Sequence, residues 1–86
     1  MAKFDRFVIE NLNMLFKRDY LSEEEVEFLV AIQYTIDENI NAIMNKRTNS
    51  FYNVLELSTE NNCSVTKIKE VLNSLQKKGI IYELVN

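Results

Sequence analysis

The sequence has 86 residues, of which 47% are hydrophobic and 27% charged, and its formal net charge is −3. This size and balance predict one globular domain with a modest core, and exclude a disordered chain or an enzyme with a deep cleft and a lid. The sequence has no histidine or proline, one cysteine and one glycine. We therefore expect a mostly helical protein that is not an enzyme and holds no metal and no cofactor.

No stretch of the sequence is long and apolar enough to cross a bilayer, and its N-terminus lacks the uninterrupted apolar run of a signal peptide. We therefore expect a cytoplasmic protein without a membrane contact. Isoleucine, asparagine and lysine are frequent, whereas proline, glycine and tryptophan are scarce. This bias is expected from an AT-rich genome, such as that of a low-GC bacterium, its phages or its plasmids.

The first predicted element is a helix over residues 2–18, where apolar side chains recur at helical spacing. The apolar stripe is wider than a small monomer easily covers, so we expect part of it to contact a second chain in a homodimer. The alternative is that this helix packs only on its own domain. The residues expected at the dimer contact are Phe4, Phe7, Val8, Leu12 and Leu15.

The second predicted element is the central core helix, over residues 22–38. Ser22 as N-cap and Glu25 three residues later form a capping box ahead of an apolar run. The next segment, residues 40–44, is ambiguous between more helix and a short strand. We favour a strand that pairs antiparallel with residues 80–85, because a single C-terminal strand would leave its backbone groups unpaired.

Residues 48–79 have the pattern of a helix-turn-helix, which is a short helix, a tight turn and a longer amphipathic helix. Thr48, Asn49 and Ser50 are alternative N-caps for the first helix. Asn61 or Asn62 can adopt the left-handed backbone of the turn.

The second helix of this motif is expected over residues 64–79, with Ser64 as N-cap and Gly79 closing its C-terminus. Cys63, just before it, is expected to be a small buried packing residue. Residues 80–85 are rich in β-branched and aromatic side chains and predict a strand. The apolar face of the helix consists of Val65, Ile68, Val71, Leu72 and Leu75.

Seven residues of this region carry a resemblance to a known superfamily: Cys63, Ser64, Ile68, Leu72, Leu75, Gly79 and Ile80. In these positions the chain resembles the winged helix-turn-helix superfamily, whose second helix typically opens with Ser, has paired Leu three apart and ends in Lys-Lys-Gly-Ile before a strand. The resemblance extends from the helix after Ser22 to the end of the sequence. It implies a mainly α, winged-helix-like fold with an extra N-terminal helix, a short two-stranded β element and a truncated wing.

The charges are unevenly distributed along the sequence. Residues 1–45 contain four basic and nine acidic side chains, whereas residues 46–79 contain six basic and three acidic ones. The basic excess therefore falls on the helix-turn-helix, where cations and helix N-termini can contact phosphates and polar side chains can read base edges. The predicted DNA-binding residues are Lys46, Arg47, Ser64, Thr66, Lys67, Lys69, Glu70, Asn73 and Lys77.

Two functions follow as hypotheses. The first is sequence-specific binding of double-stranded DNA by a homodimer, as a small transcriptional repressor or regulator, or as a plasmid or phage segregation-site binder. The second is a winged-helix-like protein-interaction module, such as a phage-encoded inhibitor, whose acidic N-terminal half binds a protein partner. A continuous positive face favours DNA, and its interruption by Glu56, Glu60 and Glu70 favours a protein partner.

Overall fold

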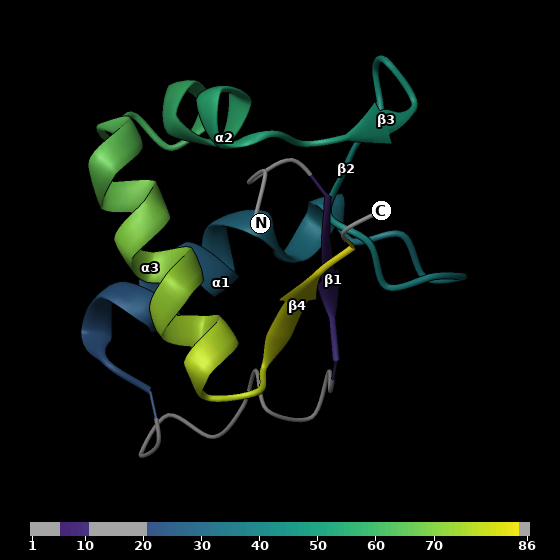
Figure 1. The fold of residues 1–86 in the computed structure, drawn as a ribbon. Helices are drawn as coiled ribbons and strands as arrows, with labels where there is room; N and C mark the ends of the chain where they lie inside the picture. The colour runs from purple at the N-terminus through teal and green to yellow at the C-terminus, as the bar shows by residue number, and fades with distance from the viewer. Residues whose placement is uncertain (1–5, 11–20, 85–86) are drawn as a thin grey trace.

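The longest helix, α3 (Val65–Lys77), packs against two other helices and a strand in a computed structural model that describes residues 6–10 and 21–84 (Figure 1). The prediction for this helix is confirmed. Ser64 is its N-cap and accepts a hydrogen bond from the Lys67 amide at 3.1 Å. Gly79 follows the helix with a φ of 73°, a left-handed conformation that glycine adopts without steric cost.

The helix before it, α2 (Val54–Glu60), is joined to α3 by the predicted turn, in which Asn62 has a φ of 53°. The predicted caps Thr48, Asn49 and Ser50 are wrong, because Asn53 begins the helix. The Asn53 side chain accepts from the Glu56 amide at 2.8 Å, and the Glu56 carboxylate accepts from the Asn53 amide at 3.2 Å. This reciprocal capping box satisfies two amides that a helix start otherwise leaves without a partner.

The segment before α2 forms a β-hairpin instead of a helix start. Strand β2 (Met44–Asn45) pairs antiparallel with β3 (Ser50–Phe51), and residues 46–49 make the turn. Asn49 has a φ of 55°, which asparagine tolerates better than most residues. The Tyr52 amide donates to the Ile43 carbonyl at 3.0 Å and so extends the pairing.

Helix α1 (Glu23–Ile32) begins with the predicted capping box, because Ser22 and Glu25 exchange side-chain to backbone hydrogen bonds. It ends earlier than the predicted residue 38, and the 3₁₀ turn η2 (Gln33–Thr35) follows. The Thr35 hydroxyl donates to the Ile32 carbonyl at 2.7 Å, and the Asp37 side chain accepts from the Asn39 amide at 2.8 Å. These side-chain hydrogen bonds satisfy backbone groups that a longer helix would otherwise use, so they favour the end of α1 before residue 38.

The predicted N-terminal helix is wrong at residues 7–9, which form strand β1 (Phe7–Ile9). It pairs antiparallel with β4 (Ile81–Glu83), with Val8 opposite Tyr82. All three residues of β1 are buried, so the strand is covered on both faces and lacks the alternation that identifies a half-exposed strand. Residues 2–5 and 11–18 of the predicted helix, which include Phe4, Leu12 and Leu15, lie outside the described residues.

The segment at residues 40–44, which was predicted to pair with residues 80–85, has a different partner. Residues 40–44 do not pair with β4, because β1 lies between the two segments. The Ile9 amide donates to the Asn41 carbonyl at 2.8 Å, and the Ile43 amide donates to the Phe7 carbonyl at 2.9 Å. Val8 forms an isolated bridge with Ala42 on the edge of β1 opposite β4. A strand that precedes the helices thus completes the sheet.

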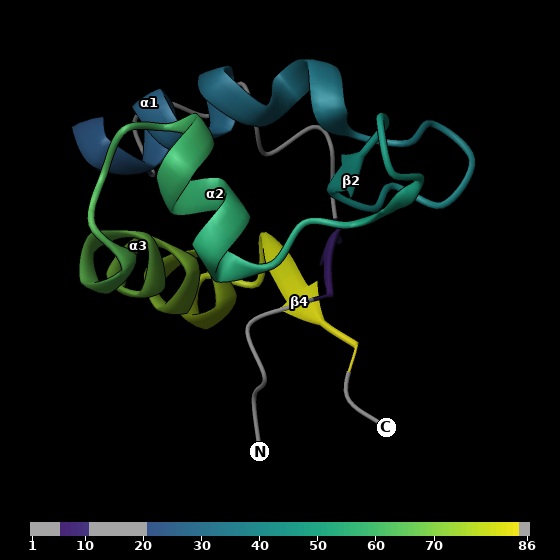
Figure 2. The ribbon, with the colours of Figure 1, turned by 90° about the horizontal axis from the view of Figure 1, so that it is seen from above.

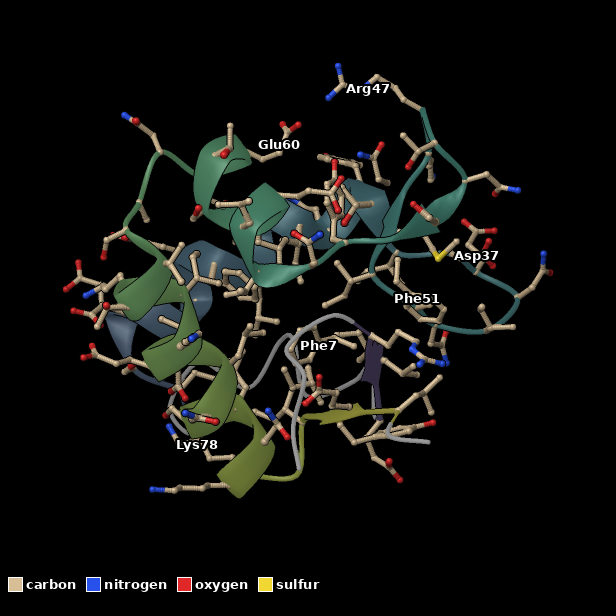
Figure 3. The ribbon with its side chains drawn as sticks, turned by 45° about the horizontal axis from the view of Figure 1, so that its top comes forward. Phe7, Asp37, Arg47, Phe51, Glu60 and Lys78 are labelled. Carbon is tan, nitrogen blue, oxygen red and sulfur yellow. The ribbon has the colours of Figure 1, made fainter. Side chains whose placement is uncertain are left out.

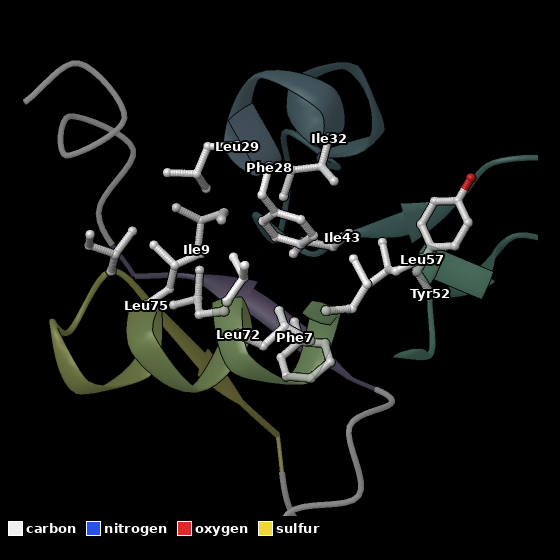
Figure 4. Packing of buried hydrophobic residues seen from close by; sticks show 14 of the residues in the cluster. Phe7, Ile9, Phe28, Leu29, Ile32, Ile43, Tyr52, Leu57, Leu72 and Leu75 are labelled. Carbon is white, nitrogen blue, oxygen red and sulfur yellow. The ribbon is translucent and has the colours of Figure 1, made fainter. Parts of the chain in front are cut away.

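The core lies between α1, α3 and the β1–β4 pair (Figure 4). Phe7 from β1 has no exposed surface, and Leu72 and Leu75 from α3 are equally buried. The described residues therefore form a small α/β domain with more strand than the expected mainly α fold. Within residues 6–10 and 21–84, no helix is long and apolar enough to cross a membrane. The buried cluster consists of Phe7, Ile9, Leu21, Phe28, Leu29, Ile32, Ile43, Tyr52, Leu57, Ile68, Val71, Leu72, Leu75, Ile80 and Ile81.

Candidate nucleic-acid interface

The outward face of α3 carries five of the predicted DNA-binding residues. At about 100° per residue they fall within an arc of roughly 100° on one side of the helix, while Ile68, Val71, Leu72 and Leu75 on the opposite side are buried in the core. The five exposed residues are Thr66, Lys69, Glu70, Asn73 and Lys77. Two ammonium groups, a carboxylate, an amide and a hydroxyl are therefore presented together on one rigid helix.

The N-terminal end of α3 is fixed by its own hydrogen bonds. The Ser64 hydroxyl accepts from the Lys67 amide, so its position is set by the cap. Across the turn, the Asn61 side chain donates to the Leu57 carbonyl at 2.8 Å, and the Cys63 amide donates to the Ser58 carbonyl at 3.0 Å. Cys63 itself is exposed, so its predicted burial is wrong. The turn holds the start of α3 through its backbone and needs no packing by the thiol.

Lys67 lies at the border of this face and turns towards α1. Its Nζ is 2.5 Å from Oε1 of Glu24, and both side chains are partly exposed. The hydrogen bond to Glu24 favours the charged ammonium and raises the pKa of Lys67 above its usual value. An exposed ion pair of this kind adds little stability. The carboxylate of Glu24 nevertheless offsets the positive charge that Lys67 would add to the outward face of α3.

The other predicted cations, Lys46 and Arg47, stand on the turn of the β2–β3 hairpin. Arg47 Nη2 is 2.9 Å from Oε1 of Glu60 on α2 (Figure 3). The hairpin is also tied to α2 through Asn45, whose side-chain Nδ2 donates to Oε2 of Glu56 at 3.1 Å. Because α2 lies between this hairpin and α3 (Figures 1 and 2), the basic residues of the hairpin and those of α3 form two separate groups. By the criterion of a continuous positive face this separation favours a protein partner, so DNA binding has to rest on the outward face of α3 alone.

Glu25 has a structural role that its capping-box pattern does not predict. Glu25 is 1% exposed, and beyond its cap at Ser22 it accepts hydrogen bonds from Ser74 Oγ and Lys78 Nζ, both at 2.5 Å. Burial alone would raise the pKa of this carboxyl, but the bonds from Lys78, Ser22 and Ser74 outweigh it and lower the pKa from 4.5 to about 2. Glu25 thereby joins the start of α1 to the end of α3.

The Glu25 bonds hold α3 against α1 and leave its outward face pointing away from the core. The sequence predicts the Ser22–Glu25 cap. It does not predict the hydrogen bonds that Glu25 accepts from Ser74 and Lys78, which lie 49 and 53 residues further along the chain. The one available signal is the spacing of Ser74 and Lys78, which places two hydrogen-bond donors on one side of α3 next to its buried stripe.

The described residues form no group of three or more acidic or cysteine side chains that could hold a metal ion. The outward face of α3 offers hydrogen-bond donors, acceptors and charges to a binding partner. Comparison of the chain with protein-family models, curated proteins and solved structures found no significant match.

Proposed function

We propose that this protein binds double-stranded DNA in a sequence-specific manner, with α3 lying in the major groove. One observation carries the proposal, namely that five polar residues of a helix anchored in the core face outward together. A small DNA-binding protein needs such a helix, because a single α-helix fits the major groove, which is about 12 Å wide. The output is repression or regulation of transcription, or assembly on a plasmid or phage segregation site.

The outward side chains match the chemistry of base edges and phosphates. The Asn73 amide can donate to and accept from adenine, and the Glu70 carboxylate can accept from the amino group of cytosine. Lys69 and Lys77 are separated by eight positions, or about 12 Å along the helix axis, and can contact phosphates at two points. Glu70 repels phosphates unless it finds a base donor, so it favours particular sequences over DNA in general.

The intrachain ion pairs set a limit on the non-specific affinity. Lys67 is held by Glu24 and Arg47 by Glu60, so each must exchange a carboxylate for a phosphate before it adds to binding. We take the exposed lysines Lys46, Lys69 and Lys77 as the phosphate contacts of one chain. Three contacts predict a slope of about −3 for the logarithm of the association constant against that of the salt concentration.

A homodimer is part of this proposal, because a two-fold pair would place two α3 helices in successive major grooves about 34 Å apart. Phe7 and Val8 were predicted at its contact, but both are buried in the core of their own chain, with exposed fractions of 0% and 5%. A dimer must therefore use other surface residues.

The proposal is tested with two substitutions of matched chemistry. Asn73 lies on the outward face of α3, and Asn39 lies in the exposed turn after α1. Asn73→Glu and Asn39→Glu each add one negative charge at an exposed asparagine. We expect Asn73→Glu to weaken binding to a random-sequence duplex by about tenfold and Asn39→Glu by less than about twofold, measured by fluorescence anisotropy. Equal losses for both variants would show that α3 is not the binding element.

Sequence specificity is tested by selection from a pool of duplexes with a randomised centre. The parent protein should enrich a defined site. Asn73→Ala should relax the preference at one base pair, at a cost of about 1–3 kcal/mol on the parent site. If the parent enriches no sequence, the specific part of the proposal fails even if non-specific binding is present.

A further inference from the structure

A surface groove separates the first turns of α1 from the first turns of α3, on the side of α3 that faces away from the proposed DNA contacts. Its volume is about 490 Å³, and the turn that follows α2 closes one end of it. The floor is apolar and consists of Phe28, Ile68 and Val71, which are at most 5% exposed. Its size lies within the range of clefts that bind small ligands or single anchoring side chains.

The rim of the groove is acidic. Glu23, Glu24 and Glu27 line it from α1, and Lys67 is the one basic residue among its lining side chains in the described part of the chain. Lys67 is already bonded to Glu24. Among the described residues, the carboxylates of Glu23 and Glu27 have no hydrogen bond or ion pair. The groove thus combines an apolar floor with two carboxylates available to a cation.

Glutamates in the first turn of a helix have an ordinary explanation, because they offset the positive end of the helix dipole. This explanation covers Glu23 and Glu24 but not Glu27, which lies one turn further along α1. The dipole effect falls off within the first turn, so it does not account for a third carboxylate on the same rim.

Two exposed apolar side chains lie outside the groove, Val30 on α1 and Tyr34 on the turn η2 that follows it. Val30 is 48% and Tyr34 81% exposed. At about 100° per residue, Glu23, Glu27 and Val30 lie within an arc of about 60° on α1, beside the groove-lining Ala31. Exposed apolar side chains beside an acidic groove favour a partner that brings apolar and basic side chains together.

We propose that this groove docks a basic amphipathic segment of a protein partner. An apolar side chain of the segment occupies the floor of Phe28, Ile68 and Val71, and lysine or arginine side chains bind the carboxylates of Glu23 and Glu27. The charge of the rim selects a cationic partner and excludes nucleic acid, whose phosphates the same carboxylates repel. The docking site is therefore separate from the outward face of α3 and does not depend on the DNA-binding proposal.

The probe is a synthetic peptide of about 14 residues, long enough for four helical turns, with leucines at helical spacing on one side and lysines elsewhere. It is titrated into the ¹⁵N-labelled full chain, and the amide chemical shifts are followed by NMR. We expect the largest shift changes at Ala31, Ile68 and Val71, and little change at Asn73. A peptide of the same composition with its leucines scrambled out of one stripe should bind about tenfold more weakly.

Two pairs of variants test the site. Glu27→Lys reverses one rim charge and should weaken the peptide by about tenfold, whereas Glu38→Lys makes the same change at an exposed site outside the groove and should weaken it less than about twofold. Ala31→Trp fills the groove and should weaken peptide binding by a similar factor. Ile40→Trp, at a residue that is 55% exposed and lies outside the groove, should leave peptide binding unchanged.

Equal losses for Glu27→Lys and Glu38→Lys would overturn the proposal, because they would show attraction to net charge alone. Shift changes centred on the outward face of α3 would also overturn it. A parent chain that self-associates in sedimentation, loses this association on Ala31→Trp and ignores the peptide would identify a second copy as the occupant and refute a basic partner segment. None of these measurements uses DNA, so their failure is distinct from that of the DNA proposal.

Discussion

The buried carboxylate of Glu25 makes a quantitative prediction about stability. Its pKa falls from 4.5 to about 2 in the folded chain. At about 1.4 kcal/mol per pH unit, this difference sets an upper limit of about 3 kcal/mol on the stabilisation by the charged form. Because a glutamine can still accept from the Ser22 amide and so keeps part of the cap, we expect Glu25→Gln to lower the free energy of unfolding by about 2 kcal/mol at pH 7.

The pH dependence has a definite sign. A carboxyl whose pKa is lowered on folding stabilises the protein fully above its unfolded pKa, and the stabilisation is lost as the pH falls through the folded pKa. The difference between the parent and Glu25→Gln should therefore be constant above about pH 5 and shrink to less than about 0.5 kcal/mol near pH 2. Glutamine at this position can still accept from the Ser22 amide, so the substitution removes mainly the charge.

The assay is urea denaturation followed by circular dichroism, repeated from pH 7 to pH 2. Glu23→Gln is the matched control, because Glu23 lies on the same first turn but is exposed. It should cost no more than about 0.5 kcal/mol, the scale of an exposed charge at a helix end. If Glu25→Gln and Glu23→Gln lower the stability equally, or if the Glu25→Gln difference does not shrink in acid, the role assigned to this carboxylate is refuted.

Four further substitutions, in three predictions, test the fold by the same denaturation assay. Phe7→Ala should lower the free energy of unfolding by about 3–4 kcal/mol, because Phe7 is fully buried; a loss below about 1 kcal/mol would place it outside the core. Gly79→Ala should cost about 1 kcal/mol through its positive φ alone, since a Cβ there would meet no atom within 4 Å, and an unchanged midpoint would contradict that backbone conformation. Asn53→Ala should cost about 1 kcal/mol and Ser50→Ala less than about 0.5 kcal/mol, whereas the reverse order would restore the cap predicted from the sequence.

The helix α3 could be predicted from the sequence because its determinants are local. A serine cap, apolar residues at helical spacing and a terminal glycine lie within sixteen consecutive positions, and each acts on the backbone next to it. Its outward residues follow from the same periodicity. The asparagine turn before it was predicted for the same reason, because Asn62 tolerates the left-handed backbone by itself.

Strand β1 could not be predicted because its determinants are distant. Its backbone pairs with residues 41–43 on one edge and with residues 81–83 on the other. Phe7, Val8 and Ile9 fit an apolar helical stripe when their neighbours along the chain are the only guide. Burial on both faces decides between strand and helix, and only the assembled sheet supplies it.

The grouping of charges likewise depends on tertiary structure. Counting along the sequence joined Lys46, Arg47 and Lys67 into one basic region. In the fold, Arg47 meets Glu60 and Lys67 meets Glu24, a residue 43 positions earlier in the sequence. The acidic and basic halves of the chain therefore neutralise each other in part, and this reduces the number of cations that the DNA proposal can use.

The most direct test of DNA binding through α3 is the salt dependence of affinity for a random-sequence duplex of about 24 base pairs, long enough for two major-groove sites. The parent chain is compared with the double variant Lys69→Ala and Lys77→Ala, after circular dichroism has shown that both are folded. We predict a logarithmic salt slope of about −3 per chain for the parent and about −1 for the double variant. Identical slopes, or no binding by the parent at low salt, would contradict the account.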